Sequence, residues 1–238
     1  MAFGFLSVLP VPQKKEWSDR DFGWSALFYP AVGALIGAAA GWAFLLLSRI
    51  FERPLAAFLT LIIWILLSGA LHWDGLADCF DGFGCSAPPE RRLEIMKDPK
   101  LGTYGALGVF CAVILKWLCI RFLPASKGPL FFALTGASAR WAILFLIRIP
   151  LANPNGLAAM LQKNCPKHIV LYACPLPLLL AFLNGGLGGF IYPAVNVLLI
   201  GFLALIAKRK IGGINGDILG FGIELAEIVL LLCAQVIP

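Results

Sequence analysis

The chain has 238 residues, of which 60% are hydrophobic and only 13% are charged, and its formal net charge is +6. Its mean hydropathy is +0.88, and its apolar runs repeatedly reach the ~20 residues that a helix needs to cross a membrane. This composition excludes an ordinary soluble domain. Because a bilayer offers no partner to exposed strand edges, it favours helices over strands. We therefore expect an all-α polytopic membrane protein. The basic residues are spread over short loops, which argues against nucleic acid as a partner.

About seven helices are expected to span the membrane within a single integral membrane domain, residues 1–238. The fifth span is short and contains Pro175 and Pro177. Residues 169–207 therefore form either two full spans or a re-entrant hairpin, which would leave six spans with re-entrant elements. Glycines recur every fourth residue in the first span and predict close helix packing. The expected spans are residues 22–48, 55–71, 102–120, 128–147, 169–183, 189–207 and 218–236.

Lysine and arginine residues outside the spans lie almost entirely on one predicted side of the membrane. The other side holds only Arg49, Arg53, Arg121 and Lys127. By the positive-inside rule, the side rich in lysine and arginine is cytoplasmic. We therefore expect residues 1–21 to be a cytoplasmic or interfacial segment. Residues 72–101 and 208–217 are expected to be loops on the cytoplasmic face of the inner membrane.

Three aspartates stand in the run HWDGLADCFDG at residues 72–82, at the end of an apolar stretch where charge is costly. If the run is helical, Asp78 lies about 40° and Asp81 about 20° around the axis from Asp74, so all three face one side. Large apolar residues and glycines alternate with these carboxylates, which is untypical of a solvated helix end. The pattern predicts a divalent-cation site at the membrane boundary.

The rest of this loop is predicted to contain a short helix that ends at Asp98, because the proline after it disfavours helical geometry. Arg91 lies in that helix, Lys97 precedes Asp98, and Gly102 and Gly105 lead into the next span. Glycine amides at the start of a helix can approach a phosphate group. These residues are therefore candidates for binding a phosphorylated substrate. For Arg91, a plain surface position is equally open.

A second polar group lies near the C-terminal end of the chain. On a helix, Glu224 lies about 20° and Glu227 about 80° around the axis from Asp217, so one flank can present all three carboxylates. Acidic residues at membrane depth usually mark function. We expect the two glutamates either to ligate a metal or to form buried ion pairs with Arg140 or Lys116.

Carboxylates that hold hard cations, beside lysine, arginine and glycine amides, suit displacement at a phosphoryl group. Metal ions there neutralise charge on the attacked phosphate and on the leaving group. Mg²⁺ binds a few carboxylates together with substrate phosphates and is the expected cofactor. The chain has no Walker A motif, no Rossmann glycine pattern and no Ser-His-Asp order, which excludes nucleotide-fuelled pumps and hydrolytic triads.

Five segments together resemble the signature of the cobalamin synthase family, the adenosylcobinamide-GDP ribazoletransferases. The central pair is specific: HWDGLADCFDG at 72–82 and LEIMKDPKLGTYG at 93–105. The likeness extends to FLSVLPVP at 5–12, FYP at 28–30 and GGINGDILG at 212–220, so it covers essentially the whole chain. Two positions depart from the pattern: Val8 stands where the family often has arginine, and Asn215 stands where it usually has threonine.

The resemblance implies the last assembly step of cobalamin biosynthesis. The 5'-hydroxyl of α-ribazole, or α-ribazole 5'-phosphate in the phosphorylated route, attacks adenosylcobinamide-GDP and expels GMP, which gives adenosylcobalamin or its 5'-phosphate. The implied cofactor is Mg²⁺ and the surroundings are membrane lipid, while self-association stays open. Catalytic roles are expected for Asp74, Asp78, Asp81 and Asp98. Metal ligation is expected for Asp74, Asp78, Asp81, Asp217, Glu224 and Glu227. Substrate contacts are expected for Lys97, Arg91, Arg140, Gly102, Gly105 and Asn215.

Two other functions stay open from the sequence. A CDP-alcohol phosphotransferase of lipid synthesis shares the Asp-Gly start and the displacement of a nucleoside monophosphate, but its pattern has arginine where this chain has Asp78. A divalent-cation or proton-coupled transporter would account for Glu224 and Glu227 at membrane depth. Such transporters usually contain paired halves, and the sequence shows no such repeat.

Overall fold

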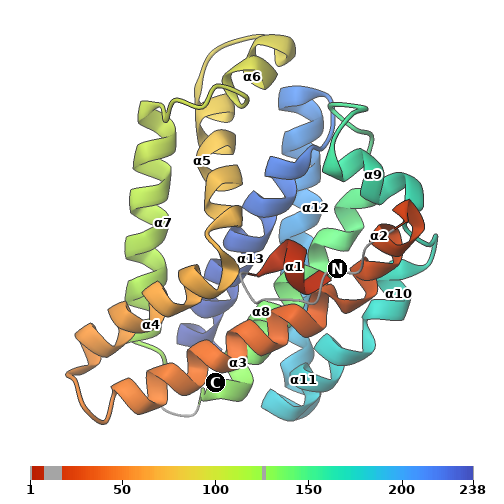
Figure 1. Ribbon diagram of the computed structural model, residues 1–238. Coiled ribbons are helices and arrows are strands. Elements are labelled where there is room, and N and C mark those ends of the chain that lie inside the picture. The colour runs from red at the N-terminus through yellow and green to blue at the C-terminus, as the bar shows by residue number, and fades with distance from the viewer. Residues whose placement is uncertain (1, 8–17, 125–126, 238) are drawn as a thin grey trace.

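The computed structural model describes residues 2–7, 18–124 and 127–237, and every regular element in these ranges is a helix (Figure 1). The expected all-α fold is confirmed. An isolated parallel bridge joins Leu151 to Ile214 and ties together two loops that are distant in sequence. The helices are α1 (Ala2–Leu6), α2 (Asp19–Ser25), η1 (Ala26–Phe28), α3 (Tyr29–Leu47), α4 (Arg53–Ser68), α5 (Leu71–Gly84), α6 (Pro89–Ile95), α7 (Thr103–Arg121), α8 (Pro129–Ala142), η2 (Ile143–Arg148), α9 (Leu157–Asn164), α10 (Ile169–Ala173), α11 (Pro175–Gly185), η3 (Gly186–Phe190), α12 (Ile191–Ile211) and α13 (Gly216–Val236).

Long apolar helices make this a multi-pass membrane protein. Four stretches of the described chain are long and apolar enough to cross a membrane: Asp19–Leu47, Thr103–Arg121, Pro129–Arg148 and Pro175–Ile211. The pair α4 and α5, which is bent by 95°, makes a fifth if it is counted as one broken span. The expected number of seven spans is not confirmed. One reason is local, because the predicted fifth span breaks into α10 and α11 just before its first proline.

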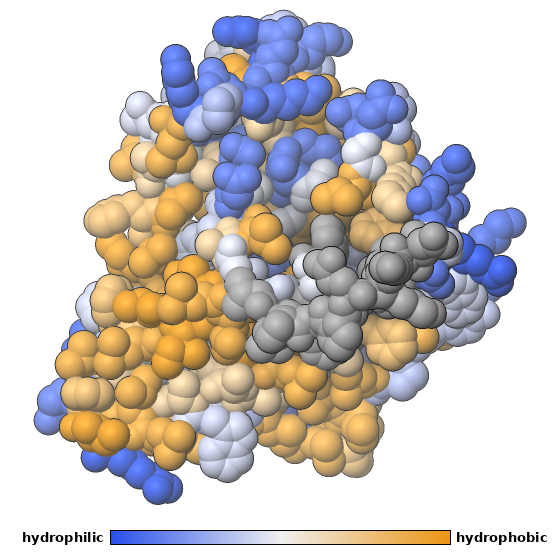
Figure 2. Space-filling view, in the orientation of Figure 1, coloured by the Kyte–Doolittle hydropathy of each residue, from blue (hydrophilic) through white to orange (hydrophobic). Residues whose placement is uncertain are grey.

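Residues 72–101 and 208–217, two of the segments that were predicted to share one membrane face, extend to one end of the molecule, whereas α1 from the predicted segment 1–21 lies near mid-height (Figure 1). In Figure 1, α6 and the C-terminal end of α12 lie at the top, whereas the connection between α3 and α4 lies at the bottom. A hydrogen bond of 3.2 Å from Lys210 Nζ to the carbonyl oxygen of Phe83 joins the end of α12 to α5. Figure 2 shows hydrophilic side chains gathered over this upper end and apolar side chains over α4 and the lower part of α7.

Glycines set how closely the central helices approach one another. On α3 and α8, Gly33 and Gly136 face each other, and a Cβ atom on either one would collide with the carbonyl oxygen of the other. The close packing predicted from the glycine spacing in the first span is thus confirmed. On α5, a Cβ atom at Gly75 would come 2.8 Å from the carbonyl oxygen of Asp217 on α13. Near the same crossing, a Cβ atom at Gly220 would come 3.2 Å from the Cα atom of His72.

Arg92 fixes the short helix α6 to the end of α5. Its Nη1 donates to the carbonyl oxygens of Gly82 (2.7 Å) and Phe83 (3.1 Å), and its Nε donates to that of Ala87 (2.7 Å). These carbonyls lie at and beyond the C-terminal end of α5, where no intrahelical donor remains for them. The guanidinium therefore holds the loop after α5 in one arrangement, and this loop carries the next part of the site.

Candidate active site

A polar pocket of about 300 Å³ lies between α5 and the segment that follows α6. Asp74 and Asp78, one turn apart on α5, line one wall, and Lys97, Asp98 and Lys100 line the other. The Asp98 carboxylate accepts the backbone N–H of Lys100 at 3.0 Å, which closes a tight turn at this wall. The structure therefore brings the two motifs of the long loop together around one space.

Asp217 adds a carboxylate from the far end of the sequence. It lies in the first turn of α13, where the Asn215 side chain accepts the N–H of Ile218 (3.0 Å) and donates to Asp217 Oδ2 (2.7 Å). Burial and the charge of Asp74 raise the pKa of Asp217, although the hydrogen bond from Asn215 lowers it. Asp74 and Asp217 also repel the charge of Asp78. In the described part of the chain, no lysine or arginine pairs with these three carboxylates.

Asp81 lies on the same helix, but its carboxylate is already engaged. Oδ2 accepts the backbone N–H of Gly102 and Oδ1 accepts that of Gly105, both at 2.8 Å. These glycines stand at the N-cap and in the first turn of α7, where the helix dipole favours a negative charge. The amides that were expected to bind a phosphate thus bind Asp81. A Cβ atom on either glycine would collide with the carboxylate, so Asp81 is a positioning residue that anchors α7 to α5.

Glu224 and Glu227 are buried in α13 and form ion pairs there. Lys116 Nζ lies 2.8 Å from Glu224 Oε2 and 2.5 Å from Glu227 Oε2, and Arg140 Nη1 lies 2.7 Å from Glu227 Oε1. The lysine also lies over the ring of Trp64, 4.6 Å from its centroid. Of the two sequence-based interpretations, the structure shows the ion pairs. Neither the glutamates nor Arg140 line the aspartate pocket, so this cluster joins α7, α8 and α13 in the interior.

For two basic residues, the structure differs from the expected set of substrate contacts. Arg91 is exposed on α6, where its Nη1 pairs with Glu94 Oε2 at 2.7 Å, and it does not line the pocket. Lys100 lines the pocket, although the sequence analysis did not place it among the substrate contacts. The signal that could have found it is its position two residues after Asp98, on the same tight turn.

The acidic residues suit a magnesium ion that is held by few protein ligands. Among the residues that the structure describes, no three His, Cys, Asp or Glu side chains are assembled as a metal cage, so the six carboxylates expected as ligands do not converge. Mg²⁺ usually binds one or two carboxylates, several waters and substrate phosphates. Asp74, Asp78 and Asp217 offer uncompensated carboxylates beside two lysines, and this combination fits a cation that arrives with a diphosphate.

The fold and the site define an integral membrane protein with an acidic, phosphate-compatible pocket at one end of a helical bundle. Comparison with known proteins gives the family. The profile of the cobalamin-5-phosphate synthase family matches residues 1–235, and the chain belongs to this family.

Curated relatives extend over nearly the whole chain. An adenosylcobinamide-GDP ribazoletransferase of Citrobacter koseri is 34% identical over 236 residues, which cover 96% of this chain and 95% of the relative. Proteins of the same name are 34% identical in Ralstonia nicotianae, covering 97% of this chain and 92% of the relative, and 36% identical in Bradyrhizobium diazoefficiens, covering 98% and 91%. No solved structure matches the chain.

Proposed function

We propose that this protein is an Mg²⁺-dependent adenosylcobinamide-GDP ribazoletransferase. It transfers the cobinamide phosphate of adenosylcobinamide-GDP to α-ribazole or α-ribazole 5'-phosphate, and it releases GMP with adenosylcobalamin or its 5'-phosphate. Family membership and the names of the whole-length relatives support this activity. The structural observation that carries the proposal is the pocket in which Asp74 and Asp78 face Lys97 and Lys100, with Asp217 beside them.

The reaction exchanges one phosphorus–oxygen bond for another. A ribose hydroxyl oxygen bonds to the phosphorus nearest the cobinamide, and the bond from that phosphorus to the bridging oxygen breaks. GMP leaves with the bridging oxygen and its electron pair. Because the phosphorylated acceptor has its 5'-oxygen blocked, the attacking hydroxyl is not the 5'-hydroxyl that was expected from the resemblance but one that both acceptors retain. Asp98, at the pocket wall, accepts the proton of that hydroxyl.

Other residues around the pocket bind the metal ion and the diphosphate or position the helices. Mg²⁺, when bound, supplies positive charge to the diphosphate oxygens and to the leaving group. Asp74, Asp78 and Asp217 would offer its carboxylate ligands, of which Mg²⁺ takes one or two, and Lys97 and Lys100 bind the diphosphate from the opposite wall. Asp81 keeps the start of α7 in place. The charged side chains of the protein are thereby positioned before substrate arrives.

We also propose that the reaction takes place at the cytoplasmic face of the inner membrane. The support is that most lysine and arginine residues outside the apolar stretches belong to segments expected on one side. The aspartate pocket lies in one of these segments, the loop 72–101. The transporter alternative was based on Glu224 and Glu227 at membrane depth. Because these glutamates form ion pairs with Lys116 and Arg140, they no longer support it.

The direct test uses purified protein in lipid vesicles with Mg²⁺, adenosylcobinamide-GDP and α-ribazole. We expect GMP and adenosylcobalamin to appear in equal amounts, and EDTA to stop both. Transfer from a CDP-alcohol donor to a second alcohol with release of CMP, or metal flux into the vesicles without either cobalamin or GMP, would overturn the proposal in favour of one of the alternatives.

A further inference from the structure

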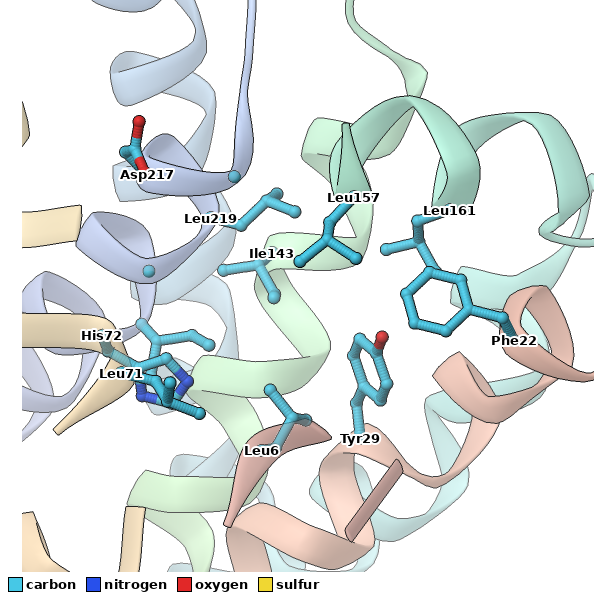
Figure 3. Close-up of a pocket in the computed structure, with 13 residues that line it drawn as sticks. Leu6, Phe22, Tyr29, Leu71, His72, Ile143, Leu157, Leu161, Asp217 and Leu219 are labelled. Carbon is cyan, nitrogen blue, oxygen red and sulfur yellow. The ribbon is translucent and has the colours of Figure 1, made fainter. Parts of the chain in front are cut away.

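An apolar pocket of about 190 Å³ lies beside the aspartate pocket, between α13 and the helices α1, α2, α3 and α9. Figure 3 shows the side chains of Phe22, Tyr29 and Leu161 on one side of it and those of His72 and Ile143 on the other. Leu71 and Leu157 are more than half exposed and lie at its rim. The wall is thus aromatic and aliphatic, with few polar side chains.

The apolar pocket borders the acidic site through Asp217. Gly216 and Asp217 contribute to its lining, and the charge of Asp217 is coupled to those of Asp74 and Asp78. His72 in the pocket wall stands two residues before Asp74 on α5. A molecule seated in the apolar pocket therefore projects any attached group past Asp217 toward the reacting phosphate.

His72 is a buried polar side chain in the pocket wall to which a ligand can bond. It is 4% exposed, and among the described residues its Nε2 has no hydrogen-bond partner. Its Nδ1 lies 3.6 Å from Glu224 Oε1, so Nε2 is the ring nitrogen that is left for a ligand. A buried polar nitrogen without a hydrogen-bond partner is costly, so His72 Nε2 favours a ligand that brings one polar atom.

The base of α-ribazole has the matching chemistry. It is a flat dimethylbenzimidazole whose first nitrogen bonds the ribose and whose second nitrogen is its one hydrogen-bond acceptor. Cavities of about 150 Å³ lined by leucine, isoleucine and phenylalanine accommodate a benzene ring, so 190 Å³ suits a fused bicyclic ring. Guanine would bury several donors and acceptors against apolar side chains, and a corrin ring is far too large.

The geometry points to the apolar pocket as the binding site for the benzimidazole base of α-ribazole, with a hydrogen bond between His72 Nε2 and the free base nitrogen. This inference rests on the proposed function, since it assigns a place to one of its two substrates. The ribose then lies next to Asp217, where its hydroxyl meets the phosphate. The pocket, rather than the aspartates, determines which lower base the enzyme accepts.

Filling the pocket tests the inference. In vesicle-reconstituted protein, L161F should raise the KM for α-ribazole at least about tenfold and leave the KM for adenosylcobinamide-GDP within about twofold. Leu198 is 74% exposed on α12, so L198F is the matched control and should change neither constant. L157W, at the rim, gives a second test if L161F does not fold. Equal rises in both KM values, or a rise for adenosylcobinamide-GDP alone, would overturn the inference.

An acceptor analogue isolates the hydrogen bond. The 5,6-dimethylindole riboside has a C–H in place of the free nitrogen, so wild-type protein should use it about tenfold less efficiently than α-ribazole. H72F should remove most of this difference between the two acceptors, whatever its effect on total activity. If H72F keeps the full difference, the assignment of His72 is wrong. Wild-type release of GMP with α-ribazole is measured in parallel, so its absence would mark failure of the proposed function instead.

Discussion

Gly75 lies against the backbone of Asp217, and a Cβ atom at this glycine would come 2.8 Å from the Asp217 carbonyl oxygen and 3.0 Å from its Cα atom. The two residues are far apart in sequence and belong to α5 and α13. This contact lets the helix that carries Asp74 and Asp78 meet the helix start that carries Asp217. The distance between the two helices therefore sets the geometry of the acidic site.

G75V is expected to push α5 from α13 and to lower kcat/KM for GMP release by about 100-fold, because displacement of reacting groups by about 1 Å can cost that much. The matched control is G201A on α12, where a Cβ atom meets nothing within 4 Å and activity should stay at the wild-type level. Wild-type turnover by G75V would show that this helix contact does not govern the site.

Asp78 and Asp81 stand on the same helix but should respond oppositely to the loss of charge. D81N removes a carboxylate that accepts two backbone N–H groups, and we expect it to lower the free energy of unfolding by about 2 kcal/mol. D78N relieves repulsion from its acidic neighbours, so it should leave stability unchanged or raise it while GMP release falls. Thermal unfolding in detergent, measured beside turnover, distinguishes the two roles. Equal destabilisation by both variants would contradict them.

The interior ion pairs predict a non-additive pair of substitutions. K116M leaves two buried carboxylates without their lysine, which we expect to cost about 3 kcal/mol of stability. Adding E224Q removes one of those charges, and Glu227 keeps its pair with Arg140. The double variant should therefore be more stable than K116M alone. Strictly additive losses of stability would show that these charges do not interact as the structure indicates.

One lysine substitution and one arginine substitution distinguish a basic residue in the pocket from one at the surface. K97A should raise the KM for adenosylcobinamide-GDP about tenfold, because Lys97 lines the pocket and a charged hydrogen bond to phosphate contributes about 1.5 kcal/mol or more. R91A removes only an exposed ion pair, so kcat and KM should stay within about twofold of wild type. The reverse pattern of KM values would place the diphosphate against α6 instead.

The sequence was sufficient to predict the helical membrane fold and to single out the two loop motifs. Helical periodicity, apolar length and proline positions are local signals, and they identified the aspartate run and the short helix after it. This helix was predicted to end at Asp98 but ends earlier, at Ile95. The glycine spacing also predicted that α3 is closely packed, because glycines on one face of a helix let a neighbouring helix approach closely. Which helix packs against α3 was not predictable, since α8 lies roughly a hundred residues further along the chain.

The sequence did not predict how carboxylates on one helix divide their roles. Periodicity places Asp74, Asp78 and Asp81 on one face, but Asp81 bonds to the start of α7, and only the tertiary fold brings that helix end to it. The same holds for Glu224 and Glu227, where ligation and ion pairing remained equally open. The approach of Lys116 and Arg140 from two other helices decided between them.

The central claim is that aspartates from α5 and α13 share one cation. The most direct test is the Mg²⁺ dependence of GMP release for wild type, D74N and D217N in vesicles at saturating substrates. We predict that D217N raises the Mg²⁺ concentration for half-maximal rate at least about tenfold, that D74N does so as well, and that high Mg²⁺ partly restores D217N. A D217N protein with wild-type turnover and an unchanged Mg²⁺ requirement would contradict the shared site.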